Sequence, residues 1–219
     1  MAAAGAYYAA GWPGFHPRRI AVTGVSAVNR AEILQRAAID RDHNVWLQNM
    51  GAAAVRIGRI PYVGAVRIRR SLPADVTIVV TERKPFAVVT DGLGRVLVDE
   101  GLRVLDPQTQ RADLPELRWK IGSVAVGQFL HAVPLVQMAA DCKRLLGASV
   151  PVARLSLDRL GDLNVWLRSG VLVEFGDDAD IARKARLVNP ILSQAPQTSR
   201  RVRALDLRAA NTPVLVFKP

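Results

Sequence analysis

The chain has 219 residues, half of them apolar, and its 30 Lys and Arg against 19 Asp and Glu give a formal net charge of +11. This length builds one or two domains of about 100 residues each, and no charge-free apolar run reaches the roughly 18 to 20 residues of a membrane helix. The charge favours an anionic neighbour, such as a membrane surface, an acidic protein or a nucleic acid. The one cysteine excludes an internal disulfide.

Residues 1–17 contain no Lys, Arg, Asp or Glu and combine Ala and Gly with four aromatic side chains, Tyr7, Tyr8, Trp12 and Phe15. Aromatic residues of this kind suit the interface between a membrane and water. The segment lacks the basic start and the cleavage site of a signal peptide. A disordered arm is the alternative interpretation.

The next stretch predicts a small domain with two helices. A short strand is expected over 19–22, a helix over 30–38 that Asn29 caps with Glu32 three residues later, and a second helix over 49–59. A hairpin then follows from Tyr62 to Pro85. The predicted order is therefore strand, helix, helix, strand, strand, with the two helices on one face of a three-stranded sheet.

The hairpin shows the clearest alternation in the chain. In its first arm Val66 and Ile68 alternate with Arg67 and Arg69, and Pro73 lies in the connection between the arms. A period of two places one set of side chains on a core and the other in water. We therefore expect an antiparallel hairpin with one solvated, basic face.

Residues 87–219 predict a second domain that mixes strands and helices. Residues 107–115 form a polar loop, and the helix over 130–146 ends at Gly147. A second helix is expected over 181–192. Strands are expected over 87–89, 95–98, 152–157, 163–167, 171–175, 201–207 and 214–217.

The sequence predicts no catalytic, cofactor-binding or metal-ligating residue, and we expect a protein that is not an enzyme. The three histidines stand far apart, and no serine or glycine motif has the setting of a nucleophile or a phosphate loop. Cys142 lies on the apolar stripe of a helix and is expected to be a packed core thiol. The acidic residues before the second helix are expected to cap it rather than to bind a cation, and they are Asp177, Asp178 and Asp180.

The hairpin and its flanks resemble the end of a POTRA domain and, more narrowly, the FtsQ/DivIB family of cell-division proteins. The matching positions are Ile60, Pro61, Val63, Val66, Arg69, Leu72, Pro73, Val80, Glu82, Arg83, Pro85 and Ala87. Further similarity lies in residues 99–105, in residues 163–171, in Phe175-Gly176 with Lys184, and in Leu205-Asp206-Leu207-Arg208. The resemblance covers about residues 18–217.

The resemblance implies an α+β fold. Residues 18–86 would be the POTRA domain, and residues 87–219 a second mixed domain on an open, largely antiparallel sheet. Residues 1–17 would be the remnant of a signal-anchor whose start lies in a longer upstream reading frame. The implied protein is a single-pass protein of the bacterial inner (plasma) membrane, with its folded part in the periplasm or extracytoplasmic space at the division septum.

The family's mode of action implies a non-catalytic scaffold that recruits other division proteins. In that family the last strand of the second domain pairs with a strand of FtsB, and FtsL is held through the same subcomplex. The chain departs from the family pattern at two positions near this edge. Ala209 replaces a residue that is often aromatic in the family, and Pro213 lacks a backbone N–H donor. The partner-binding residues implied here are Arg208, Thr212, Val214, Leu215, Val216 and Phe217.

A basic surface could also hold the POTRA domain against anionic headgroups. The arginines expected there are Arg18, Arg19, Arg67, Arg69 and Arg70. Two other functions stay open. One is a POTRA-containing chaperone or transport component of protein export, and the other is a basic nucleic-acid-binding protein, for which no recognition motif is present.

Overall fold

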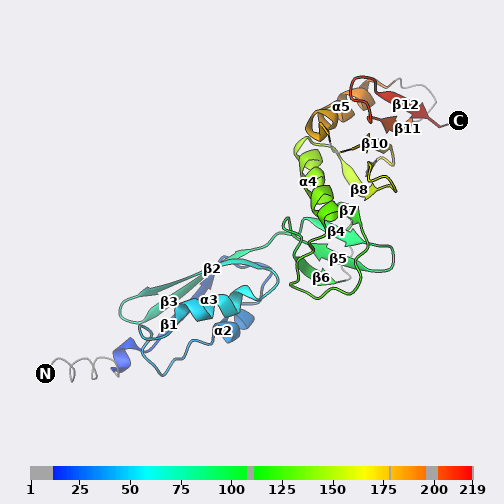
Figure 1. The fold of residues 1–219 in the computed structure, drawn as a ribbon. Coiled ribbons are helices and arrows are strands. Elements are labelled where there is room, and N and C mark those ends of the chain that lie inside the picture. Colours follow the sequence, from blue (N-terminus) through cyan, green and yellow to red (C-terminus); the bar gives the residue numbers. More distant parts are fainter. Residues whose placement is uncertain (1–11, 108–110, 178, 196–201, 219) are drawn as a thin grey trace. The chain divides into compact units, whose positions relative to one another are not determined.

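The computed structural model describes residues 12–107, 111–177, 179–195 and 202–218 (Figure 1). The chain forms two compact units, residues 1–84 and 85–219, and each has its own sheet and its own core. Most of the segment interpreted as a signal-anchor remnant lies outside the described residues. Trp12 is described, and its ring meets Phe15 edge-on beside the short 3-10 helix η1 (Pro13–Phe15). None of the helices in the described ranges has the length and apolarity needed to cross a bilayer.

The first unit has the predicted order of strand, helix, helix, strand, strand. Its elements are β1 (Arg19–Thr23), α2 (Arg30–Ala37), α3 (Met50–Gly58), β2 (Val63–Ser71) and β3 (Asp75–Glu82). Strand β3 lies in the centre of the sheet, parallel to β1 and antiparallel to β2. The fold is therefore the α+β POTRA arrangement expected from the sequence.

Local sequence starts both helices where expected. The side chain of Asn29 accepts a hydrogen bond from the Ala31 N–H at 2.8 Å, and the side chain of Asn49 accepts one from the Ala52 N–H at 2.9 Å. Each bond satisfies one of the N–H groups that a helix leaves unpaired at its first turn. The helices then bury Ile33 and Ile57 in a core that also contains Ile78 of β3.

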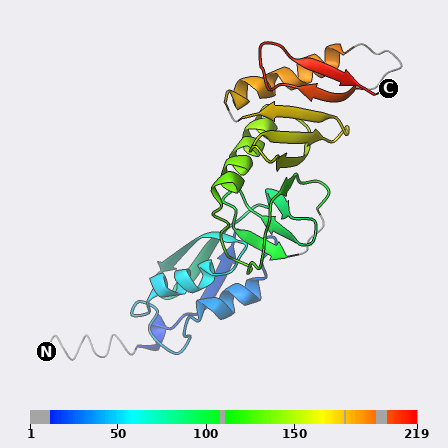
Figure 2. The ribbon, with the colours of Figure 1, turned by 45° about the vertical axis from the view of Figure 1, so that its right-hand side comes forward.

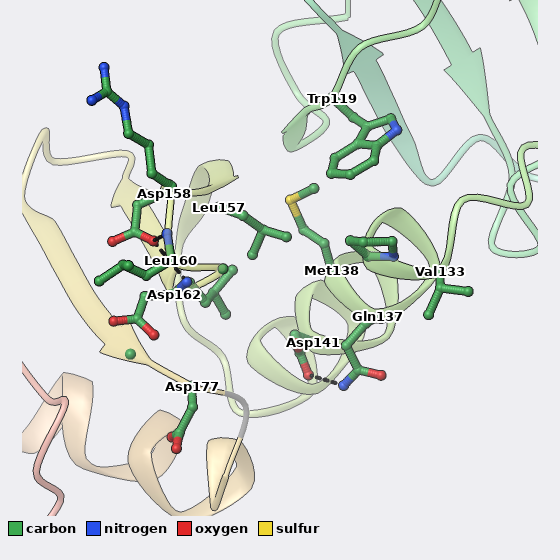
Figure 3. Close-up of a pocket in the computed structure, with 15 residues that line it drawn as sticks. Trp119, Val133, Gln137, Met138, Asp141, Leu157, Asp158, Leu160, Asp162 and Asp177 are labelled. Atoms are coloured by element: carbon green, nitrogen blue, oxygen red, sulfur yellow. Dashed lines mark hydrogen bonds between the residues drawn. The ribbon is translucent and has the colours of Figure 1, made fainter.

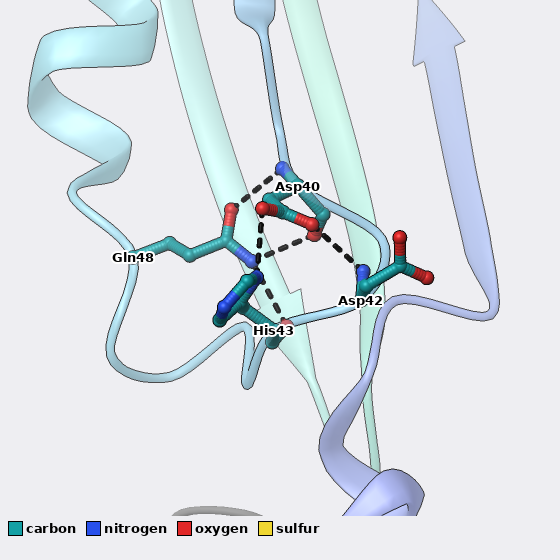
Figure 4. Close-up of polar contacts among 4 residues, drawn as sticks. All are labelled: Asp40, Asp42, His43 and Gln48. Atoms are coloured by element: carbon teal, nitrogen blue, oxygen red, sulfur yellow. Dashed lines mark hydrogen bonds and ion pairs between the residues drawn. The ribbon is translucent and has the colours of Figure 1, made fainter.

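The loop between the two helices is held by its own polar side chains (Figure 4). The Gln48 amide accepts from the Asp40 N–H at 2.9 Å and donates to the Asp40 and His43 carbonyls at 2.7 and 3.0 Å. Asp40 also accepts from the Asp42 N–H and pairs with His43 Nδ1 at 2.7 Å. The Asp42 N–H is the main cause that lowers the pKa of Asp40, and His43 adds to it. These bonds give His43 a structural role.

The second unit is a nine-stranded mixed sheet with two helices. Its elements are β4 (Ala87–Thr90), β5 (Arg95–Val98), β6 (Val104–Pro107), β7 (Glu116–Arg118), α4 (Val133–Gly147), β8 (Val152–Leu157), β9 (Leu163–Leu167), β10 (Leu172–Gly176), α5 (Ile181–Gln194), β11 (Val202–Asp206) and β12 (Val214–Phe217). The strand order is β12-β11-β10-β9-β8-β7-β4-β5-β6. Most neighbours are antiparallel, and the parallel pairs are β4–β7, β7–β8 and β10–β11.

One core joins the sheet to both helices. It contains Met138 and Leu145 of α4, Val188 of α5, and inward-facing residues of the strands such as Leu155 and Leu205. Figure 2 shows α4 and α5 running along the sheet. Side chains on the other face of strands β8 to β12 point away from this core.

The structure corrects several expected boundaries. The helix expected from residue 130 begins at Val133, because the Leu130 N–H is bonded to the Leu102 carbonyl at 3.0 Å and Pro134 lies in the first helical turn. The strand expected over 171–175 is shifted by one residue, and the strand expected from Arg201 is described from Val202 onward. Strand β7 falls just after the predicted polar loop. It was missed because three residues are too short to show a period.

Candidate partner-binding edge

Strand β12 lies at one end of the sheet and pairs with β11 only, among the strands that the structure describes. The pairing is antiparallel and sets Val214 opposite Asp206, Leu215 opposite Leu205, and Val216 opposite Ala204. In such a ladder alternate residues turn their backbone N–H and C=O groups away from the neighbouring strand. The outer side of β12 therefore presents donors and acceptors that a further strand could pair with.

The side chains of β12 alternate between the two faces of the sheet. Leu215 packs against the core, whereas Val214 and Val216 are 54 % and 42 % exposed on the other face. Phe217, the expected aromatic anchor, is half-buried opposite Val202. Thr212 lies just before the strand in a turn, with its N–H bonded to the Ala209 carbonyl at 3.2 Å.

An apolar row crosses the sheet on the face turned away from the core. Trp166 of β9 stands opposite Leu172 of β10, Leu172 opposite Ala204 of β11, and Ala204 opposite Val216 of β12. Directly opposed residues lie on one face of a sheet. The row thus leads from the middle of the sheet to its open edge. No local sequence pattern predicts this row, because it joins four separate strands.

Two of the family-like segments meet next to this edge. Gly176 has φ +73°, and a Cβ there would lie 3.1 Å from Cγ of Arg208. The Leu207 N–H donates to the Glu174 carbonyl at 2.8 Å. The backbone conformation at position 176 therefore favours glycine, and a larger residue would also push the Arg208 side chain aside.

Arg208 makes a two-pronged pair with the carboxylate of Asp206. Its Nε and Nη2 donate at 3.1 and 2.6 Å, and its backbone N–H donates to the same carboxylate at 2.9 Å. These bonds lower the pKa of Asp206. The guanidinium is held in place and stays 62 % exposed at the side-chain level, so it can still meet a partner that approaches β12.

The expected helix caps of the acidic segment are wrong for the residues that the structure describes. Asp180 occupies the N-cap position of α5 with φ 56° and makes no side-chain capping bond. Asp177 instead pairs with Lys184 at 3.3 Å, and Asp178 lies outside the described residues. Lys184 is buried and donates to the Phe175 carbonyl at 2.7 Å, which ties α5 to the end of β10.

The arginines of the first unit fall on different faces. Arg67 and Arg69 point away from the helices, and the register places Arg19 on the same face through β3, whereas Arg18 is exposed just before β1. Arg70 lies on the other face. It donates to the Val45 and Trp46 carbonyls at 3.1 and 3.0 Å and stacks on the Trp46 ring. Arg70 therefore stabilises the first unit through these contacts and does not lie on the face that carries Arg67 and Arg69.

Cys142 is buried in the core as expected, and burial raises the pKa of its thiol to about 12, which keeps it protonated and unreactive. In the part of the chain that the structure describes, no three His, Cys, Asp or Glu side chains gather as metal ligands would.

Two family models match the chain in succession. The POTRA domain of FtsQ type matches residues 15–83, and the C-terminal domain of the cell-division protein FtsQ/DivIB matches residues 87–208, more than half of the chain. The chain belongs to the FtsQ/DivIB family. Its POTRA unit and its second sheet are thus the two domains that this cell-division family combines.

Curated FtsQ proteins from distant bacteria are similar to the chain at modest identity. The cell division protein FtsQ of Streptomyces coelicolor is 25 % identical over 89 % of this chain and 75 % of its own length. That of Rhizobium meliloti is 24 % identical over 94 % of this chain and 64 % of its own. That of Novosphingobium aromaticivorans is 28 % identical over 62 % of this chain, and the match spans only 39 % of that protein.

A solved structure of the family is also similar. The major extracytoplasmic domain of DivIB from Geobacillus stearothermophilus, in its trans isomer, aligns with 53 % of this chain and 90 % of that domain. The identity is 20 % and the TM-score is 0.31.

Proposed function

We propose that this protein is a non-catalytic scaffold of the bacterial division machinery, and that it recruits an FtsB-like partner by strand addition along β12. An FtsL-like protein would be held through the same subcomplex, and other divisome components through further contacts. The folded units would lie outside a single-pass anchor in the inner membrane, at the septum. Membership of the FtsQ/DivIB family supports the role in division.

The observation that carries the binding mode is the open side of β12. Backbone groups on an edge strand supply affinity for an extended segment, and the side chains beside them supply specificity. Here Val214 and Val216 are exposed next to that edge, where exposed apolar residues mark interaction sites. The exposed guanidinium of Arg208 adds a charged group at the start of the strand.

The apolar row across the sheet indicates what the partner strand carries. A strand added to β12 continues the row that ends at Val216. Its residue opposite Val216 would therefore be apolar, because an unpaired polar or charged group at that place would lose water without gaining a partner. A large aliphatic or aromatic side chain there would extend the row by one more strand.

The role in division is tested in the living cell. The native protein, tagged with a fluorescent protein at its chromosomal locus, is expected to concentrate at the division site, and its depletion is expected to produce filamentous cells. An even distribution around the envelope with normal division would contradict the proposed scaffold. Export defects without filamentation would favour the transport alternative.

The exposed arginines of the first unit support a second contact, with anionic lipid. We expect the double variant Arg67→Glu and Arg69→Glu to bind vesicles that contain phosphatidylglycerol about tenfold or more weakly than the original chain, since each basic residue near such a surface contributes about 1 kcal/mol. The measurement is co-sedimentation at low and high salt. The double variant Arg159→Glu and Arg186→Glu, at two exposed arginines of the second unit, makes the same change of charge and is the matched control. Equal loss in the two double variants would reject this face.

A further inference from the structure

A groove in the second unit lies between the first half of α4 and the loop that joins β8 to β9 (Figure 3). Its volume is about 730 Å³. Its apolar lining comes from Trp119, Met138, Leu157 and Leu163. Figure 3 shows the Met138 side chain between Trp119 and Leu157. A hollow of this size with an apolar lining is typical of a binding site.

The loop side of the groove carries two carboxylates, Asp158 and Asp162, although the chain as a whole carries a net charge of +11. Asp177, at the end of β10, pairs with the buried Lys184 at 3.3 Å. Asp141 lies on α4, almost wholly buried, where Arg144 pairs with it at 2.6 Å. Arg159 is the one basic residue that lines the groove in the part of the chain that the structure describes.

The acidic loop is a fixed structure. The carboxylate of Asp158 accepts from the Leu160 N–H at 2.8 Å and from the Asp162 N–H at 3.0 Å. The two carboxylates therefore stand at set positions beside the apolar lining. Because screening acts over about 8 Å at physiological salt, a cation bound beside these carboxylates interacts with them more strongly than with basic residues that lie farther away than that.

Two large apolar side chains on the groove are exposed to solvent. Leu160 on the loop is 88 % exposed, and Val133 at the start of α4 is 79 % exposed. They lie on the two walls that face each other across the hollow. Val133 thus leaves the first turn of α4 exposed beside the groove, a surface that another helix could cover.

We propose that this groove binds a basic amphipathic helix of a partner protein. Its apolar side chains would lie against Val133 and Leu160, which are exposed on the two walls, and its Lys or Arg residues would pair with Asp158 and Asp162 on the loop. Laying the apolar face of a helix into a groove is a recurrent mode of peptide recognition. The groove is formed by α4 and the β8–β9 loop, whereas the proposed strand addition uses the outer side of β12.

The test uses the full chain and two labelled probe peptides of about 15 residues that share Leu at helical spacing. One has Arg at the other positions and the second has Glu. Fluorescence anisotropy is expected to show binding of the Arg peptide at least about tenfold tighter than that of the Glu peptide, weakening as salt is raised from about 50 to about 500 mM. Equal binding of the two peptides, or binding of neither, would overturn the proposal.

Two substitutions place the binding in the groove. Asp162→Lys is expected to weaken the Arg peptide about tenfold, and Leu160→Ser about fivefold, with unchanged circular dichroism. Their matched controls are Asp42→Lys and Leu93→Ser, an exposed aspartate of the first unit and a fully exposed leucine of another hairpin loop. Equal losses in variants and controls would locate the peptide elsewhere and reject the groove.

Discussion

Replacing Val216 by Asp is expected to abolish binding of the FtsB-like partner while the chain keeps its melting temperature. The side chain is 42 % exposed on the face turned away from the core, so a carboxylate is solvated in the free protein. Once a partner strand covers the apolar row, the same carboxylate loses water without a cation to pair with. We expect the affinity to fall by at least about 100-fold, which is about 2.7 kcal/mol.

The matched control is Val216→Thr, which keeps the branched shape and suits a strand. It is expected to lower the affinity by less than about fivefold. Binding is measured by calorimetric titration with a soluble fragment of the FtsB-like protein encoded in the same genome. If the Asp variant binds as tightly as the original chain, β12 is not the site of recruitment, although membership of the family stands.

The sequence predicted the first unit well because its signals are local. Asn29 and Asn49 cap helices through their own neighbours, and the alternation around Arg67 marks a strand with one wet face. Strand β7 shows the limit of such signals. Only Leu117 of its three residues is buried, and its place in the middle of the sheet depends on β4 and β8, which lie far away in the sequence.

The candidate edge was predicted in part for the same reason. The strand Val214–Phe217 was expected from its apolar run and from the resemblance. The row that ends at Val216 was not, because it depends on the register of four strands, which no local pattern records. Arg70 is a similar case. It was expected on the exposed basic surface with Arg69, and no local pattern predicts its contact with Trp46.

Glu82 is one of the positions that match the family pattern, and the sequence alone assigns it no role. Its carboxylate, at the end of β3, accepts hydrogen bonds from three successive backbone N–H groups, those of Ser26, Ala27 and Val28, at 2.9, 2.9 and 2.7 Å. The Ser26 hydroxyl adds a fourth bond at 2.7 Å. Such a run of N–H groups forms a concave site for an anion.

Gly24 makes this approach of the chain to β3 feasible. Its φ is +80°, and a Cβ there would stand 2.1 Å from the Val80 carbonyl oxygen. No other residue fits that place without moving the backbone. The bend at Gly24 leads the chain across the end of β3, so that the N–H groups of the next residues, 26–28, face Glu82. This segment connects β1 to α2.

The bonds to Glu82 determine how the first unit responds to acid. Partial burial acts to raise the pKa of Glu82, but the bonds from Val28, Ser26 and Ala27 outweigh it and lower the pKa to about 2, from 4.5 in the unfolded chain. The stabilisation is therefore complete above about pH 5 and is lost as the pH falls toward 2. The difference amounts to roughly 3 kcal/mol, which solvent screening of this partly exposed group reduces to about 2.

Glu82→Gln keeps the size of the side chain and removes its charge. The NH2 group that replaces one carboxylate oxygen cannot accept the hydrogen bonds donated to that oxygen. We expect the variant to lose about 2 kcal/mol at pH 7, close to 10 °C in the melting of the first unit. The gap between the original chain and the variant should close as the pH falls from 5 to 2. In that window the carboxylate of the unfolded chain takes up a proton, whereas that of the folded chain keeps its charge until about pH 2. Asp42→Asn, which removes a carboxylate that accepts none of the hydrogen bonds described here, controls for net charge. A gap of the same size at pH 2 and pH 7 would mean that packing, and not the charge on Glu82, holds the segment from Ser26 to Val28 against β3.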